Sequence, residues 1–424
     1  MMVGRPCCGL GQLPCLGRTR HDAGVRLKAK ATNASNGSGG GGGGGGGREG
    51  LSPVFRRPFL LGASGCTAGL VASSGGRGGV SHAASVAEGS NCAIPRAEVA
   101  PGLNISRVVK GCWQLSGGHR GDKASDRTQG KNAVEDFDAF VSAGITTFDT
   151  ADIYGPSEEL IGKYLDSRGG SEGVQVFTKS CCFGSDMSNI SEKQVEKRIK
   201  ASRMRLRQAE LDLVQLYWHD YSIKNYVDAM TCLYANNNVK NVGVTNFDVK
   251  RMSEMVDAGV PPVLNQIQYS LLDRRPENGM TDFCSKNNIK LLPYGVIAGG
   301  FLSDKYLNTP ASEVKFDTYS KQKYASVIQQ LGGWNWFQEL LSVLHGVAEK
   351  HETTIANVAS KWVLDRPEVV GILIGARNAS HVSDTVHVNE VTFDRSDLEA
   401  INAVLDKGNK AKGDCYDWER GGTF

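Results

Sequence analysis

The sequence "ITTFDTADIYG", residues 145–155, combines a strand-like run with a polar loop. Its first half is apolar and β-branched and reaches an acid, Asp149. Its second half brings Tyr154 shortly before Pro156, and proline is typical of the first turn of a helix. A strand that ends in polar residues and leads into a helix is the repeating unit of α/β folds. The stretch therefore predicts one such unit.

Seven further segments have the same strand-like character, and between them apolar residues recur at the three- and four-residue spacing of helices. Ser191 and Asp248 are expected to cap two of these helices. Eight alternating units favour a closed (β/α)₈ TIM barrel of the α/β class over residues 104–410. The pattern G-x-G-x-x-G occurs only inside a polyglycine run, which argues against an open dinucleotide-binding sheet. The seven segments are residues 105–113, 174–179, 211–219, 240–247, 262–270, 289–295 and 369–376.

The first 87 residues contain nine consecutive glycines and ten Lys or Arg against two acids. Such a composition is typical of a disordered targeting peptide. Within it, residues 55–87 resemble a twin-arginine signal, as in the two-part targeting sequence of a plant or algal thylakoid protein. A one-step transit peptide fits equally well. We therefore expect a chloroplast protein, with stroma and lumen left open, in which residues 88–103 form a linker and residues 411–424 a C-terminal tail.

The whole chain carries a net charge of +3, and the basic leader accounts for all of it. The remainder is acidic, so no nucleic-acid partner is expected. The longest apolar run is too short to span a bilayer, and no stable membrane insertion is expected. The eleven cysteines lack metal-binding spacing, so no metal is expected. The adjacent pair Cys181 and Cys182 is expected to be buried and reduced rather than a redox switch.

Polar residues mark the ends of three consecutive predicted strands: Asp149, Lys179 and His219. With Tyr154 from the first loop, they should meet at one barrel mouth. An ammonium group stabilises a phenolate, an aspartate fixes the ammonium, and an imidazole can orient a carbonyl oxygen. Such a set can protonate the oxygen that develops when a hydride reaches a carbonyl carbon. Asp152 is expected to be a bystander, either solvated or bonded to the loop backbone.

Seven ordered motifs, including "FDTADIYG", "VFTK", "LDLVQLYWHD", "VGVTNF" and "PYGVIAGGFLSDKY", are similar to those of the aldo-keto reductase family. The resemblance covers roughly residues 104–410. It implies a barrel that binds NADPH across its mouth and reduces a small-molecule carbonyl substrate. Tyr154 would be the general acid, Lys179 and Asp149 its tuning pair, and His219 the residue that orients the carbonyl.

The same resemblance implies a set of cofactor-binding residues. Thr245, Asn246 and Gln266 would bind the carboxamide, Tyr294 would stack on the nicotinamide, Gly295, Ile297, Gly299 and Gly300 would approach the pyrophosphate, and Gly375, Arg377, His381 and Asp384 would lie at the adenosine end. Arg377 favours the 2′-phosphate of NADPH, but His381 and Asp384 depart from the family pattern, so NADH is not excluded.

Trp113 and Trp218 are candidates for an aromatic substrate pocket. A monomer or a weak oligomer is expected. A second hypothesis stays open, because the barrel subunits associated with potassium channels keep the same four catalytic residues. On that reading the chain would be a cofactor-bound regulatory subunit with little turnover.

Overall fold

The computed structural model describes residues 94–116, 130–376 and 378–424, and its eight parallel strands form one sheet. The strand order is β10-β3-β4-β5-β6-β7-β8-β9. A parallel bridge between Leu291 and Val369 joins the two ends of this order, so the predicted (β/α)₈ barrel is confirmed. The strands are β3 (Val108–Gly111), β4 (Thr147–Asp149), β5 (Gln175–Cys182), β6 (Leu213–Trp218), β7 (Val242–Thr245), β8 (Leu264–Gln268), β9 (Lys290–Tyr294) and β10 (Ile372–Gly375).

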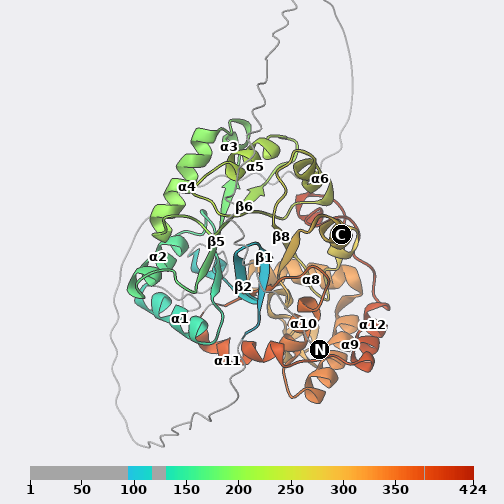
Figure 1. Ribbon diagram of the computed structural model, residues 1–424. Coiled ribbons are helices and arrows are strands. Elements are labelled where there is room, and N and C mark those ends of the chain that lie inside the picture. Colours follow the sequence, from blue (N-terminus) through green and yellow to red (C-terminus); the bar gives the residue numbers. More distant parts are fainter. Residues whose placement is uncertain (1–93, 117–129, 377) are drawn as a thin grey trace, which may run out of the picture. The chain divides into compact units, whose positions relative to one another are not determined.

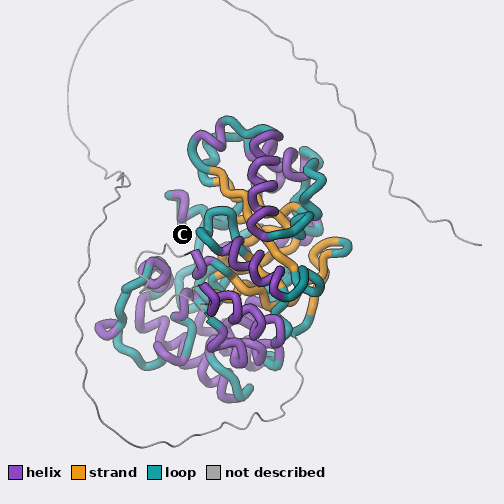
Figure 2. Tube along the Cα trace, turned by 90° about the vertical axis from the view of Figure 1, so that its left-hand side faces the viewer, coloured by secondary structure: helices purple, strands orange, loops and turns teal. Residues whose placement is uncertain are grey.

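Helices surround these strands on the outside, as Figures 1 and 2 show from two directions. The side chain of Ser191 accepts a hydrogen bond from the amide of Gln194, and that of Asp248 accepts one from Arg251, so both predicted N-caps are confirmed. The helices are α1 (Gly130–Ser142), α2 (Ser157–Ser167), α3 (Ser185–Ser188), α4 (Glu192–Leu206), α5 (Tyr226–Tyr234), α6 (Val249–Asp257), α7 (Met280–Asn287), α8 (Tyr319–Leu331), α9 (Gly333–Lys350), α10 (Ile355–Leu364), α11 (Val382–Thr385) and α12 (Arg395–Leu405).

A two-stranded hairpin precedes the barrel, formed by β1 (Arg96–Ala100) and β2 (Leu103–Ser106) around Pro101 and Gly102. Its residues Val99, Leu103 and Ile105 are buried in one cluster with side chains of the barrel strands. Residues 88–103 were predicted to form a linker, and this prediction is wrong from residue 96 onward, where β1 begins. The predicted strand at 105–113 is in fact two elements, because β2 ends at Ser106 before β3 begins.

The side chains inside the barrel lie in three layers, because alternate residues of each strand point inward. The first layer, next to the hairpin, is apolar and includes Phe177 of β5 and Leu213 of β6, which are register partners. The second is polar and includes Lys179 and Gln215, which are also partners. The third, at the mouth, includes Cys181 and Tyr217. We call these the floor, the polar layer and the mouth layer.

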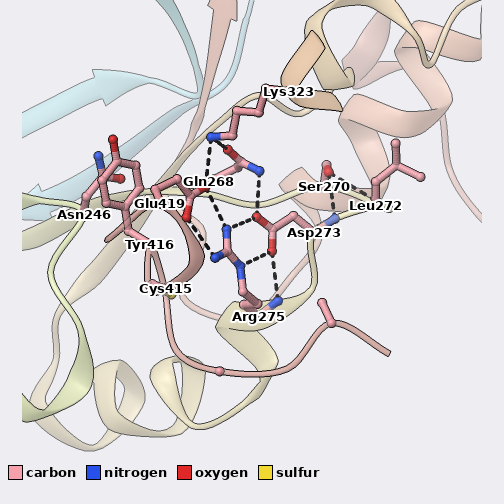
Figure 3. A network of polar contacts seen from close by, with 12 residues as sticks. Asn246, Gln268, Ser270, Leu272, Asp273, Arg275, Lys323, Cys415, Tyr416 and Glu419 are labelled. Carbon is pink, nitrogen blue, oxygen red and sulfur yellow. Dashed lines mark hydrogen bonds and ion pairs between the residues drawn. The ribbon is translucent and has the colours of Figure 1, made fainter. Parts of the chain in front are cut away.

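The insertion after β9 and residues 411–424, which we call the C-terminal segment, meet beside the mouth. Lys323 of α8 forms an ion pair of 2.9 Å with Glu419 and donates to Gln268 at the end of β8. Figure 3 shows the guanidinium of Arg275 between Glu419 and Asp273, which it contacts at 2.9 and 2.7 Å. Because Arg275 is 1% exposed, this cation depends on both carboxylates. The C-terminal segment is thus anchored to the barrel.

Among the described helices, none is both long enough and apolar enough to cross a membrane. Likewise, the described part of the chain holds no group of three or more His, Cys, Asp or Glu side chains arranged to bind a metal ion.

Candidate active site

The carboxylate of Asp149 is the centre of the polar layer. Its Oδ1 accepts a hydrogen bond from Lys179, and its Oδ2 accepts one from Gln215 and one from Gln266, each at 2.7 Å. The three donors come from β5, β6 and β8, while Asp149 ends β4. Three donors, one of them charged, offset the cost of removing a carboxylate from water. The network therefore fixes the Asp149 carboxylate at one position inside the barrel.

Lys179 couples this carboxylate to Tyr154. Its Nζ lies 5.0 Å from the centre of the Tyr154 ring and also donates to the carbonyl of Thr150 at 2.9 Å. Burial lowers the pKa of Lys179. Asp149 and Tyr154 together raise it by more than burial lowers it, so the pKa of Lys179 lies above its usual value. The lysine is therefore a permanent cation under the phenol. It lies inside β5 rather than at its end, because the strand continues to Cys182.

Tyr154 reaches this ammonium from the tight turn that links β4 to α2. Gly155 follows it with φ of 50°, and a Cβ there would clash with the carbonyl oxygen of Ser116, so the turn requires glycine. Burial raises the pKa of Tyr154 to about 12, although Lys179 lowers it and Asp149 raises it. Lys179 thus acts on this pKa in the expected direction, but burial has the larger effect. The phenol holds its proton at neutral pH, as a general acid must before it reacts.

Asp152 is a structural residue. Its carboxylate accepts from the amide of Cys181 at 3.2 Å and pairs with Arg198 of α4 at 3.0 Å, and its side chain is 10% exposed. The expected backbone contact is confirmed, but the side chain is not solvated. Burial raises the pKa of Asp152 to about 6, and Arg198 lowers it in part.

Replacing Asp152 by asparagine should change turnover by no more than about twofold, because Asn keeps the contact to Cys181. Stability should respond to pH. In the wild type, the pKa of the Asp152 carboxyl rises from 3.8 to about 6 on folding. The free energy of unfolding therefore falls as the pH rises from 3.8 to about 6. The loss amounts to roughly 3 kcal/mol. Urea unfolding of both proteins at pH 4 and pH 7 measures this effect. Relative to the wild type, the unfolding free energy of the variant should be higher at pH 7 than at pH 4 by about that amount. An equal difference at both values would contradict this account.

The two predicted residues at the end of β6 differ in burial. His219 is at the barrel mouth, but it follows the end of β6 and is exposed. Its ring lies 5.5 Å from that of Phe183, and its Nδ1 lies 3.3 Å from the hydroxyl of Tyr217. Trp218 is fully buried beneath the helices and donates to the carbonyl of Ile223, so the prediction that it lines a substrate pocket is wrong.

Trp113 begins the 3₁₀ turn after β3 and is 38% exposed. Phe183, at the end of β5, is exposed to a similar degree. These two aromatic rings are available at the surface, as a substrate-facing wall requires.

The residues implied for the carboxamide surround the polar layer. Gln266 donates to Asp149 and to Gln215, and Thr245 donates to Gln215 at 3.0 Å. Asn246 has a left-handed backbone with φ of 61°, and its Oδ1 accepts a hydrogen bond of 2.9 Å from Tyr294. The amide of Asn246 matches the donor and acceptor pattern of a carboxamide, whereas the amide nitrogen of Gln266 already donates to Asp149 and Gln215. The residues present therefore fit a nicotinamide ring.

The glycine-rich turn after β9 includes the 3₁₀ helix Ala298–Gly300. A Cβ on Gly295 would clash with the hydroxyl of Tyr324 of α8, and one on Gly299 would press on the same ring, whereas Gly300 has open space and φ of 94°. Tyr324 therefore covers two of these glycines, and Gly300 offers its backbone to a ligand. Ile297 is packed against the core. Of the four residues predicted to approach the pyrophosphate, only Gly300 has open space beside its backbone.

The residues implied for the adenosine end lie past β10. Gly375 ends β10, His381 is exposed in the 3₁₀ turn before α11, and Asp384 accepts from Asn357 at 3.0 and 3.3 Å. Arg377 lies outside the described residues, as does the leader with its expected targeting signals.

Cys181 and Cys182 are both free and buried, as expected. Burial raises the pKa of both thiols, that of Cys182 to about 11. A thiol with a raised pKa forms little reactive thiolate at neutral pH.

Gln215 bonds Asp149, Thr245 and Gln266 at once, and it was not predicted from the sequence. The signal was the alternation of β6: if Leu213 faces the interior, then Gln215 and Tyr217 do as well. Glu419 and Lys323 were missed too, because their pairing depends on how two distant segments cross the mouth.

Comparisons with known proteins agree with this geometry. Residues 107–406 match the model of the "Aldo/keto reductase family". The chain is 26% identical over 316 residues to the aldo-keto reductase YhdN of Bacillus subtilis, covering 72% of this chain and 91% of that one. It is 28% identical over 309 residues to a chloroplastic pyridoxal reductase of Arabidopsis thaliana, covering 67% and 79%. The fold is similar to that of a Gluconobacter oxydans glycerol dehydrogenase, with a TM-score of 0.63 at 23% identity and coverage of 75% and 97%.

Proposed function

This chain belongs to the aldo/keto reductase family, and on that premise we propose that it reduces an aldehyde or a ketone to an alcohol with NADPH. The observation that carries the proposal is the buried chain of contacts from Asp149 through Lys179 to Tyr154. A protonated phenol can donate its proton to an oxygen that gains negative charge, and a cation fixed beside the phenol stabilises the phenolate that remains.

When bound, the reduced nicotinamide supplies a hydride. The protein residues do the rest. Tyr154 gives its proton to the carbonyl oxygen, and Lys179 stabilises the phenolate that remains. Asp149 holds Lys179 in place and keeps it charged. Asn246, Gln266 and Tyr294 orient the ring so that one face is presented to the substrate. The exposed rings of Trp113 and Phe183 support an apolar carbonyl substrate.

NADPH oxidation and NADH oxidation should be measured in parallel against a panel of aldehydes, ketones and quinones. Turnover of several carbonyls supports the proposal. Tight cofactor binding without turnover of any of them, together with a stoichiometric partner protein, would instead favour the regulatory subunit.

The preference for NADPH is proposed from Arg377, since a guanidinium forks onto the oxygens of a phosphate. Replacing Arg377 by alanine should raise the KM for NADPH by about 10- to 100-fold, the loss of one charge-assisted contact, and leave that for NADH nearly unchanged. Steady-state kinetics with both cofactors measures this. Arg395→Ala is the matched control, because that arginine is exposed on α12 and pairs only locally with Glu399. Equal losses with both cofactors would argue against the phosphate contact.

We also propose the chloroplast as the location, supported by the basic, acid-poor composition of the first 87 residues. Fractionation of the source organism followed by N-terminal sequencing of the mature chain tests it, and the cleavage site distinguishes stroma from lumen.

A further inference from the structure

Tyr217 lies on the inner side of β6. Along this strand Leu213 belongs to the floor and Gln215 bonds Asp149, so odd-numbered residues face the interior. Val214 and Trp218 belong instead to the cluster beneath the helices. Because side chains alternate along a strand, Tyr217 stands in the inward row directly above Gln215. His219 follows only after the strand has ended.

The neighbours of Tyr217 place it on the same side of the mouth as Tyr154. Its register partner on β5 is Cys181, just as Gln215 is the partner of Lys179. Lys179, two residues before Cys181 in the same inward row of β5, lies 5.0 Å from the centre of the Tyr154 ring. Tyr217 therefore lies one layer above the register partner of the lysine that contacts Tyr154. Tyr217 is only partly buried, and its ring lies 5.6 Å from that of Phe183 at the end of β5.

The hydroxyl of Tyr217 lies near Tyr416 of the C-terminal segment, which lowers the pKa of Tyr217 in part. Arg275 and Lys323 anchor that segment through Glu419. Burial raises the pKa of Tyr217, so the group stays protonated and can donate. Its other neighbour is Nδ1 of the exposed His219, at a long 3.3 Å. A carbonyl oxygen entering the mouth can replace so long a contact.

We propose that Tyr217, rather than His219, is the second hydrogen-bond donor to the substrate carbonyl oxygen, beside Tyr154. This rests on the proposed reductase function. Tyr217 keeps its proton throughout: the hydride goes to the carbonyl carbon, the proton of Tyr154 goes to the oxygen, and Tyr217 stabilises the negative charge that builds up between these events. The site would thus use two phenols, one that gives up its proton and one that does not.

The test compares Tyr217→Phe with the wild type in single-turnover reduction of an aldehyde that the wild type accepts. Loss of one donor to a developing oxyanion should slow hydride transfer by about 10²-fold. The primary isotope effect with 4-deuterated cofactor should rise, and cofactor affinity should stay the same. A role in packing alone would not raise the isotope effect. Tyr234→Phe removes the hydroxyl of an exposed tyrosine outside the barrel and is the matched control.

Tyr416→Phe provides a second measurement, because it leaves Tyr217 in place but removes the neighbouring hydroxyl that lowers the pKa of Tyr217. A loss of about 3- to 10-fold is expected. Unchanged hydride transfer in Tyr217→Phe overturns the proposal. So does a larger loss in His219→Gln than in Tyr217→Phe, which would assign the role to the histidine. A wild type that binds NADPH and reduces no carbonyl overturns the reductase function itself, a result visible before any variant is made.

Discussion

Replacing Tyr154 by phenylalanine should slow reduction of the carbonyl on the order of 10³-fold, while cofactor affinity stays within about twofold of the wild type. The change removes a single hydroxyl group and keeps the ring above Lys179. Without that hydroxyl, no group in contact with Lys179 remains to give a proton to the carbonyl oxygen. Stopped-flow measurement of NADPH oxidation and a fluorescence titration of cofactor binding separate the two effects.

The pH dependence belongs to the same prediction. Burial raises the pKa of Tyr154 to about 12, so the wild-type rate of hydride transfer should show no loss from ionisation of this phenol between pH 6 and pH 9. A rate in Tyr154→Phe within threefold of the wild type would remove the phenol from the mechanism. A steep alkaline decline below pH 9 would show that the bound cofactor lowers this pKa strongly.

Replacing Lys179 by methionine should abolish measurable turnover and also destabilise the fold. Methionine fills much of the same volume, but it leaves the buried Asp149 carboxylate with two amide donors and no cation. Breaking a buried ion pair from one side costs about 3–5 kcal/mol of unfolding free energy. Urea unfolding and the aldehyde assay measure the two losses.

Lys110→Met is the matched control for this variant. Lys110 is as buried as Lys179, but it donates to a backbone carbonyl and lies over the rings of Phe137 and Phe140 rather than beside a carboxylate. Its loss should cost less stability and leave turnover within about threefold. The double variant Asp149→Asn, Lys179→Met should recover stability but no activity, since both charges are then gone. Recovery of activity would contradict the assigned role of Lys179.

The barrel was accessible from the sequence because each strand is a short, continuous apolar run followed by helical spacing. The hairpin at residues 96–106 was not recognised, although Pro101 and Gly102 form a dipeptide typical of turns. Its strands are only five and four residues long, and on their own they bury too little apolar surface to stand out from a linker. They are stabilised by the barrel floor, which is a tertiary contact.

The candidate site was predictable to the extent that its residues belong to one local motif or end a strand. Asp149, Tyr154 and Lys179 meet as expected. The prediction for Trp218 on β6 is wrong because a residue reaches the mouth only if its side chain points into the barrel. Trp218 and Tyr217 are neighbours in sequence, yet they face opposite sides of the strand. The raised pKa of Tyr154 was missed as well, since the effect of burial exceeds that of the nearest charge.

The three interior layers also bear on how such an enzyme can change over evolution. One carboxylate in the polar layer holds together four strands, so mutations there act on catalysis and folding at once. The exposed rings of Trp113 and Phe183 take no part in this network. New substrates can therefore be acquired by substitutions around the rim, while the acid and its supporting charges are inherited unchanged.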